Sequence, residues 1–143
     1  MIPCTDFIPA YSELFKYLHA RGGAAAVHAF WADLADRFLT NLRDLVAEHG
    51  LAGCWHYWSQ TLNEEAADFT MTLDDEAGEF HIIMHHCPSK GRLLAEPHLE
   101  PYAEYCAHCD VLYRRVLEPL GYTFTLELSR VDEAACALTV RRR

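Results

Sequence analysis

The chain is poor in positive charge and has no long apolar run. Its 143 residues include 12 lysines and arginines against 21 acidic residues, for a formal net charge of −9. This balance gives no broad basic surface, and arginines 141–143 are too few to change it. Nucleic acid and anionic membranes are therefore disfavoured as partners. No stretch approaches the roughly 18 apolar residues of a membrane-spanning helix.

Residues 1–6 also lack the charged segment and apolar core of a secretory signal. We therefore expect a cytoplasmic protein, in which the six cysteines stay reduced. Their spacing is then better read for metal binding or catalysis than for disulfides. No Gly-rich phosphate loop, internal repeat or low-complexity tract is present.

The first half of the chain has the three- and four-residue apolar spacing of amphipathic helices. Residues 9–20 predict a short helix that ends at an Arg-Gly-Gly break. Residues 24–48 predict a longer helix that stops near Gly50. The aromatic-rich residues 51–65 are compatible with a third helix.

From Asp68 the apolar period changes to two, which is typical of half-buried strands. Two hairpins flanking a helix are expected, with strands at 68–73, 80–86, 122–128 and 136–140, a loop at 87–92 and the helix at 101–117. We predict a single domain over residues 1–143, with a helical half at 1–65 and a ββαββ half at 66–143. Its fold class is α+β, with N-terminal helices followed by a four-stranded antiparallel sheet packed by helices.

Cysteine and histidine gather between His85 and Asp110, and a further cysteine lies in the last predicted strand. The inward face of the predicted helix 101–117 and the core face of the last predicted strand could bring three or four sulfurs together, with a histidine beside them. Such a set suits zinc or another thiophilic metal. The candidate ligands are Cys87, Cys106, Cys109, Cys136 and His86, with His85 as an alternative. A reactive thiol and plain core packing are the other two interpretations.

Two further features have alternative interpretations. Asp110 either orients a histidine or activates a water, or simply faces solvent. Trp55 and His56 either line a ligand pocket, or belong to core and surface respectively. We expect His98 and His108 on the surface.

The order of these motifs resembles the L-2-amino-thiazoline-4-carboxylic acid hydrolase family. The resemblance covers roughly residues 65–142 and is carried by Cys87-Pro88 after a strand, Cys109-Asp110 in a helix, and Cys136 in a final strand. At the level of layout, the chain also resembles the vinyl-reductase-type small-ligand domains, some of which hold zinc with cysteines.

The hydrolase resemblance implies an enzyme that opens a small cyclic isothiourea or a related C–N or C–S bond. It implies a catalytic site with Cys87, Cys109, Asp110 and Cys136 at the motif positions, and with His86 beside them. One assignment makes Cys87 or Cys109 the nucleophile, with His86 or Asp110 as the base. The other has a metal, held by the same cysteines, carry the attacking water. Lys90 and Arg92 are the nearest cations for a substrate carboxylate; otherwise they belong to a solvated loop. The other resemblance implies a sensor-like domain that binds a small molecule or metal without catalysis. In both cases we expect a small-molecule substrate or ligand as the partner. A third interpretation is a cysteine-rich helper protein that binds a metal or a partner, with an exposed apolar patch at residues 55–58. The oligomeric state is left open.

Overall fold

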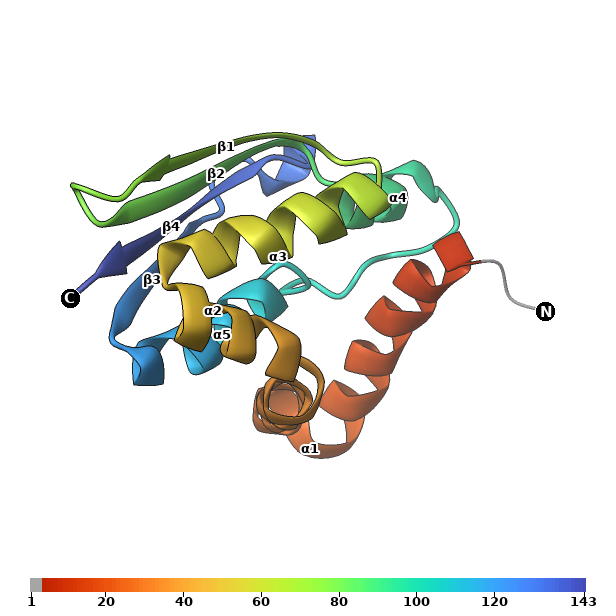
Figure 1. Ribbon diagram of the computed structural model, residues 1–143. Coiled ribbons are helices and arrows are strands. Elements are labelled where there is room, and N and C mark those ends of the chain that lie inside the picture. Colours follow the sequence, from red (N-terminus) through yellow and green to blue (C-terminus); the bar gives the residue numbers. More distant parts are fainter. Residues whose placement is uncertain (1–3) are drawn as a thin grey trace.

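The computed structural model describes residues 4–143, with helices in the first half and all four strands in the second (Figure 1). The regular elements are α1 Phe7–Phe38, α2 Thr40–His49, α3 Leu51–Glu64, β1 Asp68–Asp74, β2 Glu79–His86, α4 Pro88–Ala95, α5 Ala107–Leu117, β3 Tyr122–Glu127 and β4 Cys136–Arg142. Three short 3-10 turns complete the structure: η1 Cys4–Asp6, η2 Glu118–Leu120 and η3 Val131–Glu133.

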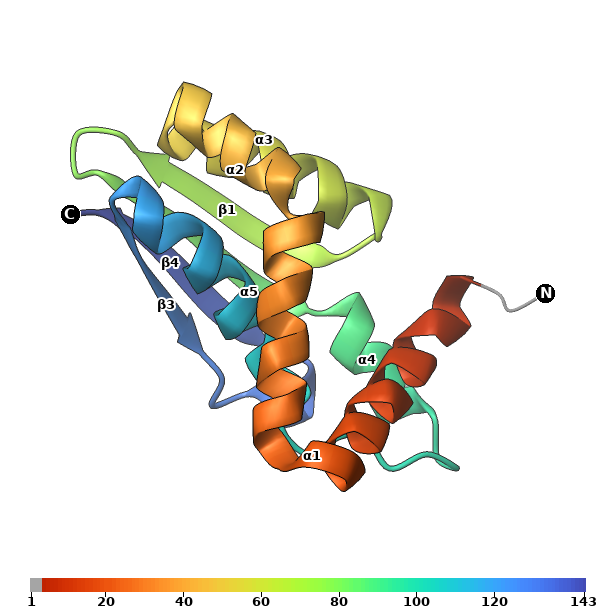
Figure 2. The same cartoon turned by 90° about the horizontal axis from the view of Figure 1, so that it is seen from below.

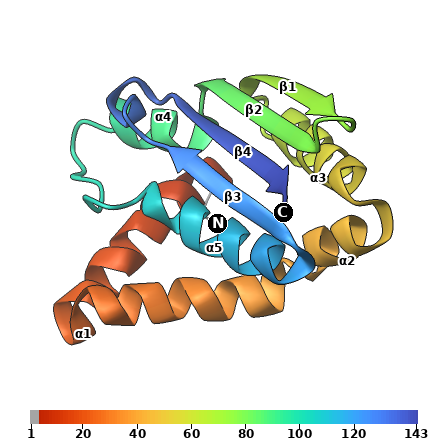
Figure 3. The ribbon, with the colours of Figure 1, turned by 90° about the vertical axis from the view of Figure 1, so that its left-hand side faces the viewer.

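The strands form one antiparallel sheet in the order β1-β2-β4-β3. The helices lie on one face of this sheet, and the other face is uncovered (Figure 3). The predicted α+β fold, with N-terminal helices and a four-stranded antiparallel sheet, is thereby confirmed. No helix among residues 4–143 has the length and apolar character needed to cross a membrane.

Alternation along the strands decides which face of the sheet is buried. Phe80, Ile82 and Met84 of β2 are buried against the helices, and the Phe80 ring stacks on Trp58 of α3 at a centroid distance of 5.6 Å. On the uncovered face, Thr72 pairs across the sheet with His81. This is the alternation expected when one face of an antiparallel sheet contacts the core and the other contacts water.

The N-terminal helices differ from the prediction in where they break. α1 continues through the Arg-Gly-Gly segment but bends at Gly23, whose φ of 68° and ψ of −170° are not helical. The two arms of α1 form a V when seen from below (Figure 2). The predicted helix 24–48 is divided at Leu39, where φ and ψ are −95° and 28°. The predicted third helix is present as α3.

The segment after β2 was expected to be a loop but forms the helix α4. The Cys87 sulfur accepts a hydrogen bond from the Lys90 amide at 3.5 Å and so caps this helix. Pro88 takes the first helical position, where its missing N–H removes no intrahelical bond. The next helix, expected from residue 101, begins only at Ala107, because residues 101–102 have no regular structure and residues 103–106 form turns.

Candidate functional site

A cavity of about 200 Å³ lies between the inner face of the sheet and the start of α5. Its wall is formed by the end of α3, by β2, β3 and β4, by the start of α4 and by the 131–135 turn. This volume is below the roughly 300–1,000 Å³ of sites for drug-sized ligands, so any occupant must be small.

Four cysteines from three parts of the fold line this cavity: Cys87, Cys106, Cys109 and Cys136. Cys87 follows β2, Cys106 is the N-cap residue of α5, Cys109 lies in its first turn and Cys136 begins β4. The structure therefore brings together the four cysteines that the sequence singled out. None of the four is in a disulfide.

The four thiols hold their protons at neutral pH. The pKa of Cys106 is raised to about 11 and that of Cys136 to about 12. In both cases burial is the largest cause and repulsion from Cys109 the second largest. Burial also raises the pKa of Cys109 to about 12, with a further contribution from Glu65. Burial is the main cause of the raised pKa of Cys87. A thiol in this cavity thus needs a base if it is to react as a thiolate.

His108 is placed to be that base. Its Nδ1 contacts the carbonyl oxygen of Tyr105, an acceptor, so Nδ1 carries the proton and donates it. Nε2 is then a free acceptor, 3.5 Å from the Cys109 sulfur. Burial lowers the pKa of His108 and keeps the ring neutral. Cys109, His108 and the Tyr105 carbonyl form a thiol, a base and a group that orients the base.

The expectation that His108 lies on the surface was wrong. The ring is enclosed by aromatic side chains, with centroids 4.9 Å from Tyr105, 5.7 Å from Tyr11 and 5.9 Å from Phe15. A sequence signal for this was present. His108 follows Tyr105 by three residues and precedes Leu112 by four, which puts it on the apolar stripe of the helix.

His86 lies outside the cavity, although it follows Met84 by two residues. The register shifts at this end of the hairpin: Asp68 pairs with His86 but Phe69 pairs with Met84, leaving His85 as an extra residue. The exposed His86 ring instead covers Gly91 of α4, where a Cβ would approach Cε1 to 2.7 Å.

Asp110 also lies apart from the cavity lining. Its two carboxylate oxygens accept hydrogen bonds from Arg114 at 2.6 and 3.1 Å, and Arg114 continues to Glu118 at 3.1 Å. These contacts run along the outer side of α5 with i to i+4 spacing. The carboxylate is thus occupied by an arginine rather than by a histidine or the cavity.

The two candidate cations have different surroundings. Lys90 lines the cavity and lies near enough to Cys106 to lower its pKa against the larger effect of burial. Arg92 forms ion pairs with Asp6 at 3.1 Å and with Glu96 at 2.6 Å, and does not line the cavity. Glu65, which the sequence reasoning did not single out, adds a carboxylate to the lining.

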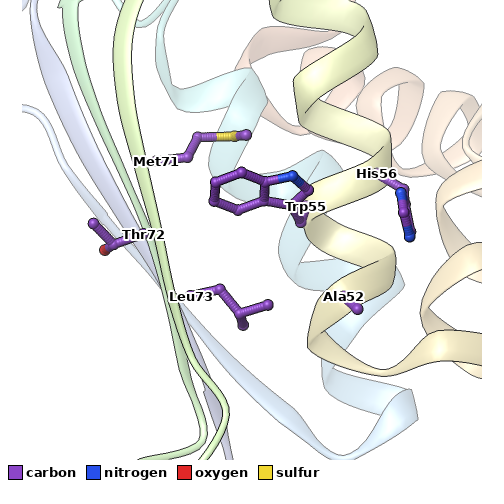
Figure 4. Close-up of a pocket in the computed structure, with 6 residues that line it drawn as sticks. All are labelled: Ala52, Trp55, His56, Met71, Thr72 and Leu73. Atoms are coloured by element: carbon purple, nitrogen blue, oxygen red, sulfur yellow. The ribbon is translucent and has the colours of Figure 1, made fainter.

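Trp55 and His56 belong to a different, open groove between α3 and β1. Figure 4 shows the indole of Trp55 lying toward Met71 and Leu73, with His56 on the far side of the helix. No cysteine lines this groove. Trp55 is 39% exposed, so the structure gives it a surface position rather than one beside the thiols.

A metal centre is not preformed in residues 4–143. No group of three or more His, Cys, Asp or Glu side chains there is arranged to hold a metal ion. The four thiols line one cavity from three parts of the fold, and a metal bound there would have to displace the thiol protons.

Comparison with protein-family models, with curated proteins and with solved structures finds no match for this chain. The resemblance to the thiazoline-carboxylate hydrolase family therefore stays a prediction.

Proposed function

We propose that the cavity is the active site of a thiol-dependent hydrolase for a small molecule, with Cys109 as nucleophile and His108 as base. The observation that carries this proposal is the 3.5 Å approach of His108 Nε2 to the Cys109 sulfur, with Nδ1 held by a backbone carbonyl. A neutral imidazole with a free Nε2 can take the thiol proton as the sulfur attacks. This removes the need for a thiolate in the resting protein.

We propose a cyclic isothiourea, of the L-2-amino-thiazoline-4-carboxylate type, as the substrate class. The Cys109 sulfur adds to the ring carbon between sulfur and nitrogen while its proton passes to His108. The ring C–S bond then breaks, and the departing sulfur takes that proton from the imidazolium. The product of this half-reaction is a thiol joined to Cys109 through an isothiourea.

Water completes the proposed reaction. His108 Nε2 accepts a proton from the water as its oxygen adds to the same carbon, and the bond from that carbon to Cys109 breaks. The cysteine sulfur recovers its proton, and the product is N-carbamoyl-L-cysteine. The sum is the addition of one water molecule. The ammonium group of Lys90, in the cavity wall, is the cation we assign to the substrate carboxylate.

The test is to incubate the reduced protein with L-2-amino-thiazoline-4-carboxylate and to quantify N-carbamoyl-L-cysteine by mass spectrometry. Cys109→Ala should abolish turnover. His108→Gln should lower kcat by about 10²–10⁴-fold, the usual contribution of a general base. Lys90→Met should chiefly raise KM. Cys54→Ala removes a buried thiol of α3 that does not line the cavity, and should retain wild-type turnover.

The alternative is a domain that binds a small molecule or a thiophilic metal such as zinc without catalysis. It is supported by the presence of four thiols around one cavity. Stoichiometric zinc in protein purified without an affinity tag, with Cys87, Cys106, Cys109 and Cys136 all protected from alkylation, would favour this alternative. Product formed by the wild type but not by Cys109→Ala would exclude it.

We also propose that the protein works in the cytoplasm. The five cysteines whose side chains the structure describes are all unpaired. Such a set is typical of a reducing compartment.

A further inference from the structure

Cys106 and Cys109 are three residues apart at the start of α5. Cys106 is the N-cap residue and has helical φ and ψ angles of −69° and −17°. The Cys109 amide donates a hydrogen bond to the Cys106 carbonyl at 3.3 Å, which closes the first turn between them. Helix geometry then separates their Cα atoms by roughly 5 Å, within the range of about 4.4–6.8 Å that a disulfide requires.

Both sulfurs lie in the wall of the same cavity, and Cys106 is close enough to Cys109 to be affected by its charge. Repulsion from Cys109 is the second cause, after burial, of the raised pKa of Cys106. No backbone movement between elements is needed to join two residues of one helical turn. The other two thiols of the cavity are on separate elements, and the Cys87 backbone is fixed by a 2.7 Å hydrogen bond from its amide to the Ala134 carbonyl.

We propose that Cys106 and Cys109 form a redox-active dithiol that exchanges with small-molecule disulfides and closes to an intramolecular disulfide. This activity goes beyond the proposed hydrolysis and does not depend on it. A Cys-x-x-Cys pair whose first member stands at the N-terminus of a helix has the spacing that disulfide exchange requires.

The exchange proceeds in two balanced steps. The Cys106 sulfur attacks one sulfur of the small disulfide, forming a mixed disulfide and releasing the first small thiol, which takes up the Cys106 proton. Cys109 then passes its proton to His108 Nε2 and attacks the Cys106 sulfur. The second small thiol leaves with that proton. Two protein thiols are oxidised to one disulfide, and one small disulfide is reduced to two thiols.

Cys106 is the attacking residue because it comes first in the helix and its pKa is raised less than that of Cys109. Cys109 is the resolving residue because His108 contacts its sulfur. Since only the thiolate attacks, the rate of oxidation should rise about tenfold per pH unit while the pH stays well below the Cys106 pKa.

Trypsin separates the relevant thiols. Cleavage after Arg92 and Arg114 gives a peptide of residues 93–114 that contains Cys106 and Cys109 and no other cysteine. Cys136 falls in the peptide 131–141, and Cys54 and Cys87 share the peptide 44–90. An internal Cys106–Cys109 disulfide therefore lowers the mass of peptide 93–114 by two hydrogens without linking it to another peptide.

The experiment treats the fully reduced protein with bis(2-hydroxyethyl) disulfide at pH 8, traps the remaining thiols with N-ethylmaleimide and maps the tryptic peptides. We expect peptide 93–114 to be two hydrogens lighter and unlabelled, and Cys87 and Cys136 to be labelled. A peptide 93–114 that carries two maleimides, a lasting mixed disulfide in the wild type, or a link from 93–114 to 131–141 would overturn the proposal.

Three serine variants test the roles. Cys109→Ser should trap the mixed disulfide on Cys106, and Cys106→Ser should give no internal disulfide. Cys136→Ser removes a thiol from the same cavity but should still give the lighter peptide 93–114. Circular dichroism shows whether each variant is folded, and the wild-type result decides the proposal if one is not.

The same samples separate this proposal from the hydrolase. Formation of the internal disulfide without hydrolysis in either redox state would support the dithiol and remove the hydrolase. Hydrolysis by protein whose peptide 93–114 never becomes lighter would support the hydrolase and remove the dithiol. If both hold, oxidation should abolish turnover and dithiothreitol should restore it, because the disulfide consumes the nucleophile.

Discussion

Gly53 of α3 lies directly against the backbone of α2 at Leu45, and a Cβ on residue 53 would stand 2.7 Å from the Val46 nitrogen as well. The obstacle is main chain and not the end of a flexible side chain, so it cannot move aside. This close approach lets the two helices pack together and sets the position of α3 over the sheet.

We expect Gly53→Ala to destabilise the protein by about 1–3 kcal/mol or more, the cost of overpacking. Helix propensity alone predicts the opposite sign, because alanine stabilises a helix interior by roughly 0.5–1 kcal/mol relative to glycine. Urea unfolding followed by circular dichroism measures the difference. A Gly53→Ala protein as stable as the wild type would show that α2 and α3 are less closely packed.

The bend of α1 depends on a second glycine for a different reason. A Cβ at Gly23 would meet no atom within 4 Å, but its φ of 68° and ψ of −170° belong to a region almost closed to other residues. Gly23→Ala and Gly23→Asn should therefore both cost about 1–3 kcal/mol. Asparagine relieves strain in the ordinary left-handed region but not here. The neighbouring exposed Ala24→Gly should cost no more than about 1 kcal/mol.

Acid should weaken the protein through His108. The folded-state pKa of His108 is lower than the ordinary value of 6.5. As the pH falls, the unfolded chain therefore binds a proton at this histidine before the folded protein does. Stability is then fully present above about pH 6.5 and falls as the pH drops through and below that value. The free energy of unfolding, measured from pH 8 to pH 5, should decline less steeply in His108→Gln than in the wild type.

Alkali should weaken the protein through the buried thiols. Burial raises the pKa of Cys54 from 9.0 to about 12, so between these values the unfolded chain loses a proton that the folded protein keeps. Stability is present below about pH 9 and falls as the pH rises toward 12, by up to about 1.4 kcal/mol per pH unit for this group. Cys54→Ala should flatten the slope of unfolding free energy between pH 9 and pH 10.5. An unchanged slope would remove Cys54 as a contributor.

The order of elements and the buried face of the sheet could be predicted from sequence because each depends on a local period. Phe80, Ile82 and Met84 alternate as a half-buried strand should, and the strand is where the alternation puts it. The break of the second predicted helix at Leu39 left no such signal, since apolar spacing continues across it. Cys87 as a helix cap was missed because sulfur is a weak acceptor and not a usual capping group.

The site was predictable in its cysteines and not in its base. Inward faces of one helix and one strand were enough to bring Cys109 and Cys136 together. His86 was assigned to the core face by alternation, and a single extra residue in the hairpin reversed that assignment. His108 was assigned to the surface, although its spacing from Tyr105 placed it on the apolar stripe.

The sulfur cap of α4 makes the Lys90 amide a reporter of the chemical state of Cys87. That amide proton donates to the Cys87 sulfur at 3.5 Å. Alkylation, metal ligation or oxidation at the sulfur changes the acceptor, and the Lys90 resonance and its hydrogen exchange rate should respond. An NMR spectrum of uniformly labelled protein would thus read events at one wall of the cavity separately from those at Cys106 and Cys109. It would do so without any added probe.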